Sequence, residues 1–273
     1  MTSSPALHGT AFTEGSIQAD GFTIRYFRAG RGEPVVVLHS AAGFRFSPAL
    51  DRLTDQHDVI LLVLPGWGEE PDNGRNQSLA ELADTVHLAT QALGLDSYHL
   101  LGSALSSDVA LTIALDHPER VSSLVLEAPG TFRERVDPSP LELSPEEALR
   151  AVRVHPERQP VFEPPTPDFQ ARLVALVERL MGASPDYPKE VAARLPDNPV
   201  RTLVVFGADD GYISPENGRT LARLKPHCSF VLLHDAAHDV QGDRAEDFAA
   251  LVMDFLADGS EVRLPQDATL VEP

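Results

Sequence analysis

YHLLGSALSSDVAL, residues 98–111, is the stretch that decides the fold. Its first half is an apolar run that predicts a strand, small residues predict a turn over 102–107, and a second apolar run predicts a helix. A strand that breaks sharply into a helix exposes one side chain at the apex of the turn and directs free N–H groups toward it. In the pattern G-x-S-x-G this apex carries a serine nucleophile. Counted from Gly102, the apex here is Ala104 and the second glycine position is Ser106.

The composition limits the class of protein. A chain of 273 residues that is 42% hydrophobic can bury one large core, as one domain or as a domain with an insertion. A net charge of −19 argues against nucleic acid and anionic membranes as partners. We find no apolar run long enough to span a membrane and no signal-peptide pattern at Met1-Thr2-Ser3-Ser4-Pro5. The single cysteine, Cys228, excludes an internal disulfide, favours a cytoplasmic location and is expected to pack in a strand.

Strand-like and helix-like runs alternate through most of the chain. Asp20-Gly21 separates two alternating runs, which predicts a hairpin. Ser78 and Glu81 form the pattern of a capping box at the start of a helix. Strands are expected over 16–20, 22–27, 35–39, 59–64, 98–103, 121–126, 202–206 and 229–234, and helices from 47, 78, 105, 215 and 245. This order predicts an α/β fold with a mostly parallel, doubly wound sheet and with its sites beyond the carboxyl ends of the strands.

One segment interrupts this order. Residues 131–199 are rich in proline and charge, and they contain two helix-like runs, 145–154 and 169–181. We interpret 131–199 as an inserted helical cap, or lid, over a core formed by 1–130 and 200–273. The alternative, a disordered linker, fits the apolar helical runs less well. The polar tail from Asp258 is expected to be peripheral.

Five motifs in order resemble the α/β-hydrolase fold over residues 16–257. The family pattern is a strand that ends in histidine, the strand–turn–helix elbow, a helical cap, and then an acid followed by a histidine. The corresponding pieces are His39-Ser40-Ala41-Ala42-Gly43, Pro65-Gly66-Trp67-Gly68, Gly102-Ser103-Ala104-Leu105-Ser106, Gly207-Ala208-Asp209-Asp210 and Asp235-Ala236-Ala237-His238. The resemblance implies an enzyme of the hydrolase superfamily. The histidines lack the paired spacing of metal ligands and the glycine turn lacks the lysine of a phosphate-binding loop, so no metal and no cofactor are expected.

The resemblance assigns roles to the acid and the histidine. Asp210 follows a predicted strand and would accept the Nδ1–H of His238, which fixes the imidazole tautomer. Asp209 is the rival for this role, although a turn position suits it better. His238 would move a proton near neutral pH. His39 faces the same pocket, and a role in shaping the loop is the better interpretation.

The resemblance also places two backbone N–H groups, those of Ala41 and Leu105, in an oxyanion hole. Ser40 stands where the family usually has glycine. Ser106 and Ser107 replace a common glycine pair, so a side chain at 106 is expected to crowd the elbow. Ser103 and Trp67 are expected to lie at the same pocket, and Ser103 should point away from the nucleophile position.

Ala104 is the main departure, because a methyl group cannot attack a carbonyl carbon. The three departing serines favour a pocket that has been reused over a single engineered substitution. We therefore hypothesise that a His238–Asp210 dyad acts on a small, mostly apolar organic substrate, in a lyase, isomerase, cyclase or cofactor-free oxygenation step. One alternative is a serine hydrolase (ester, lactone or carbon–carbon bond) that carries alanine for serine at position 104. Another is a non-catalytic small-molecule binder. The sequence leaves open whether the chain forms a homodimer.

Overall fold

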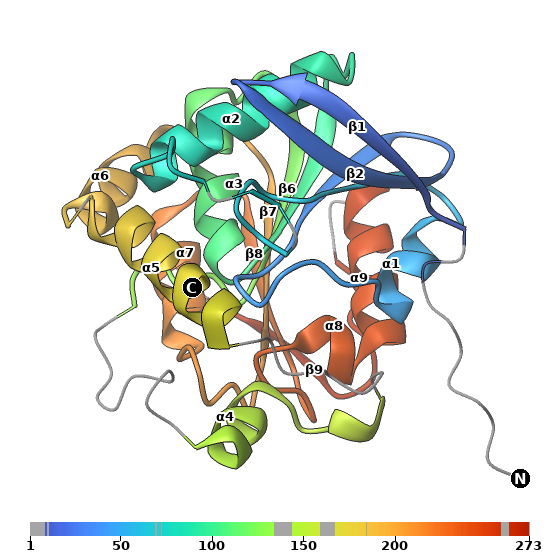
Figure 1. The fold of residues 1–273 in the computed structure, drawn as a ribbon. Helices are drawn as coiled ribbons and strands as arrows, with labels where there is room; N and C mark the ends of the chain where they lie inside the picture. The colour runs from blue at the N-terminus through green and yellow to red at the C-terminus, as the bar shows by residue number, and fades with distance from the viewer. Residues whose placement is uncertain are drawn as a thin grey trace, which may run out of the picture.

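The structure is a computed structural model that describes residues 9, 11–68, 70–71, 73–133, 144–158, 167–183, 185–257 and 262–272. Within these ranges nine strands form one sheet, in the order β1-β2-β4-β3-β5-β6-β7-β8-β9 (Figure 1). The central strands run parallel, from β4 through β3, β5, β6 and β7 to β8. The predicted α/β class with a mostly parallel sheet is confirmed.

The strands match the apolar runs of the sequence. Antiparallel pairing occurs where β1 meets β2, where β2 meets β4 and where β8 meets β9, so the hairpin predicted at Asp20-Gly21 is confirmed. The strand bounds are Thr13–Ala19 (β1), Phe22–Gly30 (β2), Pro34–Leu38 (β3), Asp58–Leu62 (β4), Tyr98–Ser103 (β5), Val121–Glu127 (β6), Thr202–Gly207 (β7), Cys228–Leu233 (β8) and Ala268–Val271 (β9).

Helices cover both faces of the sheet. In Figure 1, α2 and α3 lie on one side, and α1 and α9 lie on the other. Apart from the inserted segment, the helix bounds are Pro48–Leu53 (α1), Leu79–Ala92 (α2), Leu105–Asp116 (α3), Glu216–Leu224 (α7), Val240–Asp243 (α8) and Ala245–Leu256 (α9). The residues of α3 up to Leu115 are all buried, as expected of a helix that is apolar on most of its surface and packs between the sheet and its neighbours.

The strand order places the site. From β3 the chain passes to β4 on one side and later to β5 on the other side, so the direction of winding reverses between β3 and β5. Ligands of open α/β sheets bind at such a reversal, beyond the carboxyl ends of the strands. The loop after His39 and the elbow at Ala104 lie at these two strand ends.

Two expectations need correction. The tail is not wholly peripheral, because β9 pairs with β8 as an edge strand; its alternation was too short to stand out among polar residues. The pair at 78 and 81 is half a capping box: the Ser78 hydroxyl accepts from the Glu81 N–H, but the Glu81 carboxylate accepts from Gln77 N instead. A full capping box instead opens α4, at Ser144 and Glu147.

The inserted segment contains helices, as expected. Its predicted helices correspond to α4 (Pro145–Val152) and α5 (Pro167–Gly182), and α6 (Tyr187–Arg194) was not predicted. Short 3-10 turns lie at Pro156–Arg158 (η2) and Leu195–Asp197 (η3). Residues 134–143 and 159–166, which hold several of its prolines, lie outside the described residues. The assignment of 131–199 as a lid therefore stays a prediction.

The elbow requires glycine at position 102. A Cβ built on Gly102 would lie 2.5 Å from the backbone oxygen of Ser106, in the first turn of α3. Because backbone cannot move aside cheaply, we expect Gly102→Ala to lower the free energy of unfolding by about 1–3 kcal/mol. Urea unfolding measures this loss. Gly74→Ala is the control, since its Cβ would meet no atom within 4 Å; equal stability of the two variants would contradict the expectation.

Candidate active site

The elbow keeps its strained shape although the nucleophile is absent. Ala104 has φ 52° and ψ −116°, a conformation that costs a non-glycine residue about 1–3 kcal/mol. Its N–H donates to the Glu127 carbonyl at 2.9 Å, which ties the apex to the end of β6. The turn therefore presents a methyl group where a hydroxyl would stand in a serine enzyme.

The serines that follow do not crowd the elbow, which corrects the expectation for Ser106. Its hydroxyl accepts from Ser103 N at 2.9 Å and donates to the Leu38 carbonyl at 2.8 Å. The Ser107 hydroxyl donates to the Gly102 carbonyl at 2.8 Å. Both side chains are fully buried and form hydrogen bonds with backbone groups at the elbow. They therefore stabilise the turn through contacts that glycines could not make.

His238 is paired with Asp210. His238 Nδ1 lies 2.9 Å from Asp210 Oδ2, and Asp210 Oδ1 accepts the N–H groups of Tyr212 and Ile213, each at 2.8 Å. The Asp210 side chain is 0% exposed and that of His238 is 11% exposed. Because a carboxylate accepts, Nδ1 carries the proton and Nε2 is left as the basic nitrogen of a neutral imidazole. The Tyr212 ring packs 4.7 Å from the imidazole, centroid to centroid.

Asp209, the rival, belongs to the turn. Its N–H donates to the Ala236 carbonyl at 2.9 Å, which joins the loop after β7 to the loop that carries the histidine. The structure thus resolves a choice between adjacent aspartates that the sequence left open.

The two predicted oxyanion donors are available. The indole N–H of Trp67 donates to the Ala41 carbonyl at 3.0 Å and so holds the loop after β3. Within the described part of the chain, neither Ala41 N nor Leu105 N donates to a protein acceptor. Ser40 does not block the loop, because its hydroxyl turns to accept from Ala42 N at 3.3 Å.

His39 shapes the loop and stays neutral. Its Nε2 accepts the Leu64 N–H at 3.0 Å, so its Nδ1 must carry the proton that binds the Ser40 carbonyl at 2.8 Å. Burial lowers the pKa of His39 to about 4. An imidazole with both nitrogens engaged by backbone cannot serve as a base, so His39 keeps the loop-shaping role.

Ser103 points away from the apex, toward an acid that the sequence analysis missed. Its hydroxyl donates to Glu127 Oε2 at 2.5 Å, and the same carboxylate accepts the backbone N–H and the side-chain amide of Gln241. Burial, followed by the nearby charge of Asp239, raises the pKa of Glu127. A glutamate at the end of an apolar strand was the only signal for this network behind the elbow.

A second buried acid, Asp108, lies one turn into α3. Thr131 Oγ1 donates to its Oδ1 at 2.5 Å, and Tyr187 of α6 donates to its backbone carbonyl at 2.9 Å. Burial raises the pKa of Asp108 to about 7. The carboxyl of Asp108 is therefore largely protonated in the folded protein at mildly acidic pH, where an unfolded aspartate is ionised.

Asp108 makes the stability of the fold depend on pH. Between a pKa of about 3.9 in the unfolded chain and about 7 in the folded chain, only the folded state holds the proton, so stability falls as pH rises across this window. Asp108→Asn removes this dependence. We expect its free energy of unfolding, relative to the parent, to rise by about 4 kcal/mol between pH 4 and pH 8.

Urea unfolding at several pH values measures this difference between the two proteins. Asp96→Asn, at an exposed carboxylate, is the control and should stay at a constant offset from the parent. A pH-independent offset for Asp108→Asn would contradict the assignment of a raised pKa.

With this geometry in view, the chain can be compared with known proteins. The sequence model of the α/β hydrolase fold matches residues 33–193, more than half of the chain. The chain belongs to this family. A putative lipase from Acinetobacter baumannii has a similar structure, with a TM-score of 0.77 at 23% identity over 91% of this chain and 92% of the lipase.

Two hydrolases are also similar to this chain, one in sequence and one in structure. A 2-hydroxy-6-oxononadienedioate/2-hydroxy-6-oxononatrienedioate hydrolase from Pseudomonas putida is 27% identical over 85% of this chain and 91% of its own. A serine-to-alanine variant of a meta-cleavage product hydrolase from Pseudomonas fluorescens, complexed with acetates, has a TM-score of 0.71 at 19% identity over 89% and 97% of the two chains. The protein is an enzyme of the α/β-hydrolase superfamily, and its reaction is open.

Other predicted chemistry can be placed on the described residues. Burial raises the pKa of the Cys228 thiol to about 12, so it stays protonated and is a poor nucleophile at neutral pH. In the described ranges, no three histidine, cysteine or acidic side chains are grouped so that they could hold a metal ion. No helix in those ranges has the length and apolar character needed to cross a membrane.

Proposed function

We propose that this enzyme moves a proton on a small organic substrate with the His238–Asp210 dyad, without an acyl-enzyme. The observation that carries the proposal is the oriented dyad: a fully buried carboxylate, held by two backbone N–H groups, bonds His238 Nδ1 at 2.9 Å. Nothing else at the elbow can attack a carbonyl carbon, since Ala104 has only a methyl group and Ser103 is bonded to Glu127.

Each group has a defined task in this proposal. His238 Nε2 accepts a proton from a carbon or hydroxyl of the substrate, and the buried Asp210 carboxylate stabilises the resulting imidazolium. The electron pair left behind moves onto the substrate oxygen, which the N–H groups of Ala41 and Leu105 can bind as it becomes an oxyanion. The imidazolium then returns its proton at another atom. These steps describe an isomerase. In a lyase the electron pair instead returns from the oxygen and expels a leaving group from the carbon next to the one that lost its proton, and the imidazolium gives its proton to that leaving group.

The relatives and one cluster of charges suggest a class of substrate. The Pseudomonas putida relative is named for an unsaturated oxo diacid. Next to His238, the Asp239 carboxylate meets two guanidinium groups, those of Arg45 and Arg153. The Arg153 side chain is only 7% exposed, and its terminal nitrogens bond no acceptor among the described residues. Small oxo acids therefore belong in the substrate panel beside neutral apolar ketones.

A serine hydrolase with alanine at position 104 is the second candidate. The strained elbow of Ala104 favours it, because nothing in proton transfer requires this conformation, whereas a nucleophile does. The acid, the histidine and the two backbone donors are also those of an acyl-transfer site. A folded Ala104→Ser variant without activity would exclude this second candidate.

The experiment that tests the main proposal is proton exchange. Ketones and oxo acids are incubated with the protein in D2O, and loss of the α-proton signal is followed by NMR. We expect exchange with the parent chain and none above background when His238 is replaced. A parent chain that binds these compounds but exchanges no proton would contradict the proposal.

A further inference from the structure

The end of α4, in the inserted segment, is fixed to both loops that carry the dyad. Gly211, directly after Asp210, donates its N–H to the Ala151 carbonyl at 3.1 Å. Asp239, directly after His238, donates its N–H to the Val152 carbonyl at 2.9 Å. Consecutive carbonyls at the end of α4 thus bind the backbone N–H that directly follows each residue of the dyad.

A single carboxylate binds the backbone N–H directly before the histidine. Asp243, the last residue of α8, has Oδ2 at 2.9 Å from Ala237 N, the N–H directly before His238. The same oxygen accepts Val154 N at 2.9 Å, and Oδ1 accepts His155 N at 2.8 Å. Asp243 is 1% exposed, so its buried carboxylate is compensated by these N–H groups.

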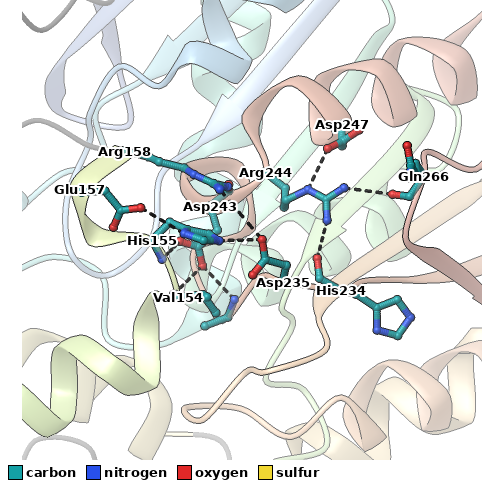
Figure 2. Close-up of polar contacts among 11 residues, drawn as sticks. Val154, His155, Glu157, Arg158, His234, Asp235, Asp243, Arg244, Asp247 and Gln266 are labelled. Atoms are coloured by element: carbon teal, nitrogen blue, oxygen red, sulfur yellow. Dashed lines mark hydrogen bonds and ion pairs between the residues drawn. The ribbon is translucent and has the colours of Figure 1, made fainter.

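A second joint connects the same two segments at the surface. His155 Nε2 lies 2.7 Å from Asp235 Oδ2, and Figure 2 shows His155 between Asp235 and Glu157. The Asp235 side chain is 55% exposed. The hydrogen bond to Asp235 raises the pKa of His155. This joint binds the inserted segment to the histidine loop but does not touch the backbone beside His238.

We propose that Asp243 is a positioning residue, which fixes His238 against Asp210 by binding the N–H before the histidine and the inserted segment with one carboxylate. The inference rests on the proposed function of the dyad. Asp243 reaches no reacting atom itself. It acts through the loop, since the bond from Asp243 to Ala237 fixes the backbone from which the imidazole extends.

The charge on Asp243 is needed for this arrangement. A carboxylate has acceptor sites on both oxygens and can receive three N–H groups at once. An asparagine of the same shape keeps one acceptor oxygen and turns its NH2 toward an N–H that it cannot bind. Either His155 or the pair Ala237 and Val154 then loses its acceptor. In the orientation that keeps Ala237, its bond is still weakened, because a neutral amide oxygen is a weaker acceptor than a carboxylate.

The experiment compares Asp243→Asn with Asp235→Asn. Both remove a carboxylate charge and a bond to the inserted segment, but only Asp243 touches Ala237. Asparagine also suits the positive φ of 58° at Asp235. The readouts are the Nδ1–H signal of His238 in ¹⁵N-labelled protein, which needs no substrate, and kcat and KM for any substrate found.

For Asp243→Asn we expect the Nδ1–H proton to exchange with water at least about tenfold faster and kcat to fall about 10- to 100-fold, because small displacements of a catalytic group are costly. KM should stay within about twofold, since Asp243 does not contact substrate. Asp235→Asn should leave all three unchanged. An unaltered His238 signal in folded Asp243→Asn, or equal effects of both variants, overturns the proposal. If the signal changes as expected but the parent has no activity, the proposed function fails and the positioning role stands.

Amide exchange in the unmodified chain gives a test that does not depend on the variant folding. If one carboxylate holds Ala237, Val154 and His155, a single opening event exposes all three N–H groups, and their protection factors should agree within about threefold. Protection of Ala237 that exceeds that of Val154 and His155 by more than about tenfold would overturn the proposal.

Discussion

Ala104→Ser is expected to hydrolyse p-nitrophenyl acetate with a burst, at a rate at least about a thousandfold above that of the parent chain. The reason is that the elbow already has the conformation a nucleophile requires, with φ 52° at position 104. A hydroxyl at this apex would lie beyond the end of β5, next to the unused N–H of Leu105. The oriented His238–Asp210 pair could take its proton.

The measurement is stopped-flow release of p-nitrophenol by the parent, Ala104→Ser and the double variant Ala104→Ser/His238→Ala. The double variant should lose the burst, because serine is a weak nucleophile without its base. A burst in Ala104→Ser alone would establish that the oxyanion donors and the dyad form a complete acyl-transfer site. A folded Ala104→Ser protein without activity would exclude the serine-hydrolase candidate and leave proton transfer as the chemistry to pursue.

The sequence predicted the fold well because the fold depends on local patterns. Apolar runs of five to seven residues gave the buried parallel strands, and the small residues around Gly102 gave the elbow. The edge strand β9 was missed because its pattern is short and one face meets solvent. Helix α6 was missed because its sequence is mostly polar and only Val191 is fully buried.

The sequence indicated candidate site residues only where a residue type has one characteristic chemical use. His238 and the pair Asp209-Asp210 could be placed by order, but the choice between the aspartates needed the hydrogen bond to His238. Asp243 gave no local signal, because its partners Val154 and His155 lie almost 90 residues earlier in the chain. The expected crowding at Ser106 was wrong because the sequence does not show that Leu38, on another strand, offers its hydroxyl an acceptor.

His238→Ala should lower the rate of proton exchange, or of any turnover found, by at least about a hundredfold, since a general base contributes on that scale. Substrate affinity should change little, because the imidazole is one of several groups at the site. Turnover is followed by NMR, and affinity by calorimetry on the same compound. His234→Ala is the matched control: His234 directly follows β8, is exposed and, among the described residues, bonds only Thr269 through its ring.

The combination of results decides what the dyad does. If His238→Ala still binds the compound and loses turnover, while His234→Ala keeps both, the base is His238 and the pocket does not depend on it. If the rate of His238→Ala equals that of the parent, the dyad assignment is wrong. His39 could not have replaced the base, since both of its nitrogens are bound to backbone. If the parent and both variants bind equally and none turns over, the dyad neither acts on this compound nor is needed to bind it, and the non-catalytic binder is the better interpretation.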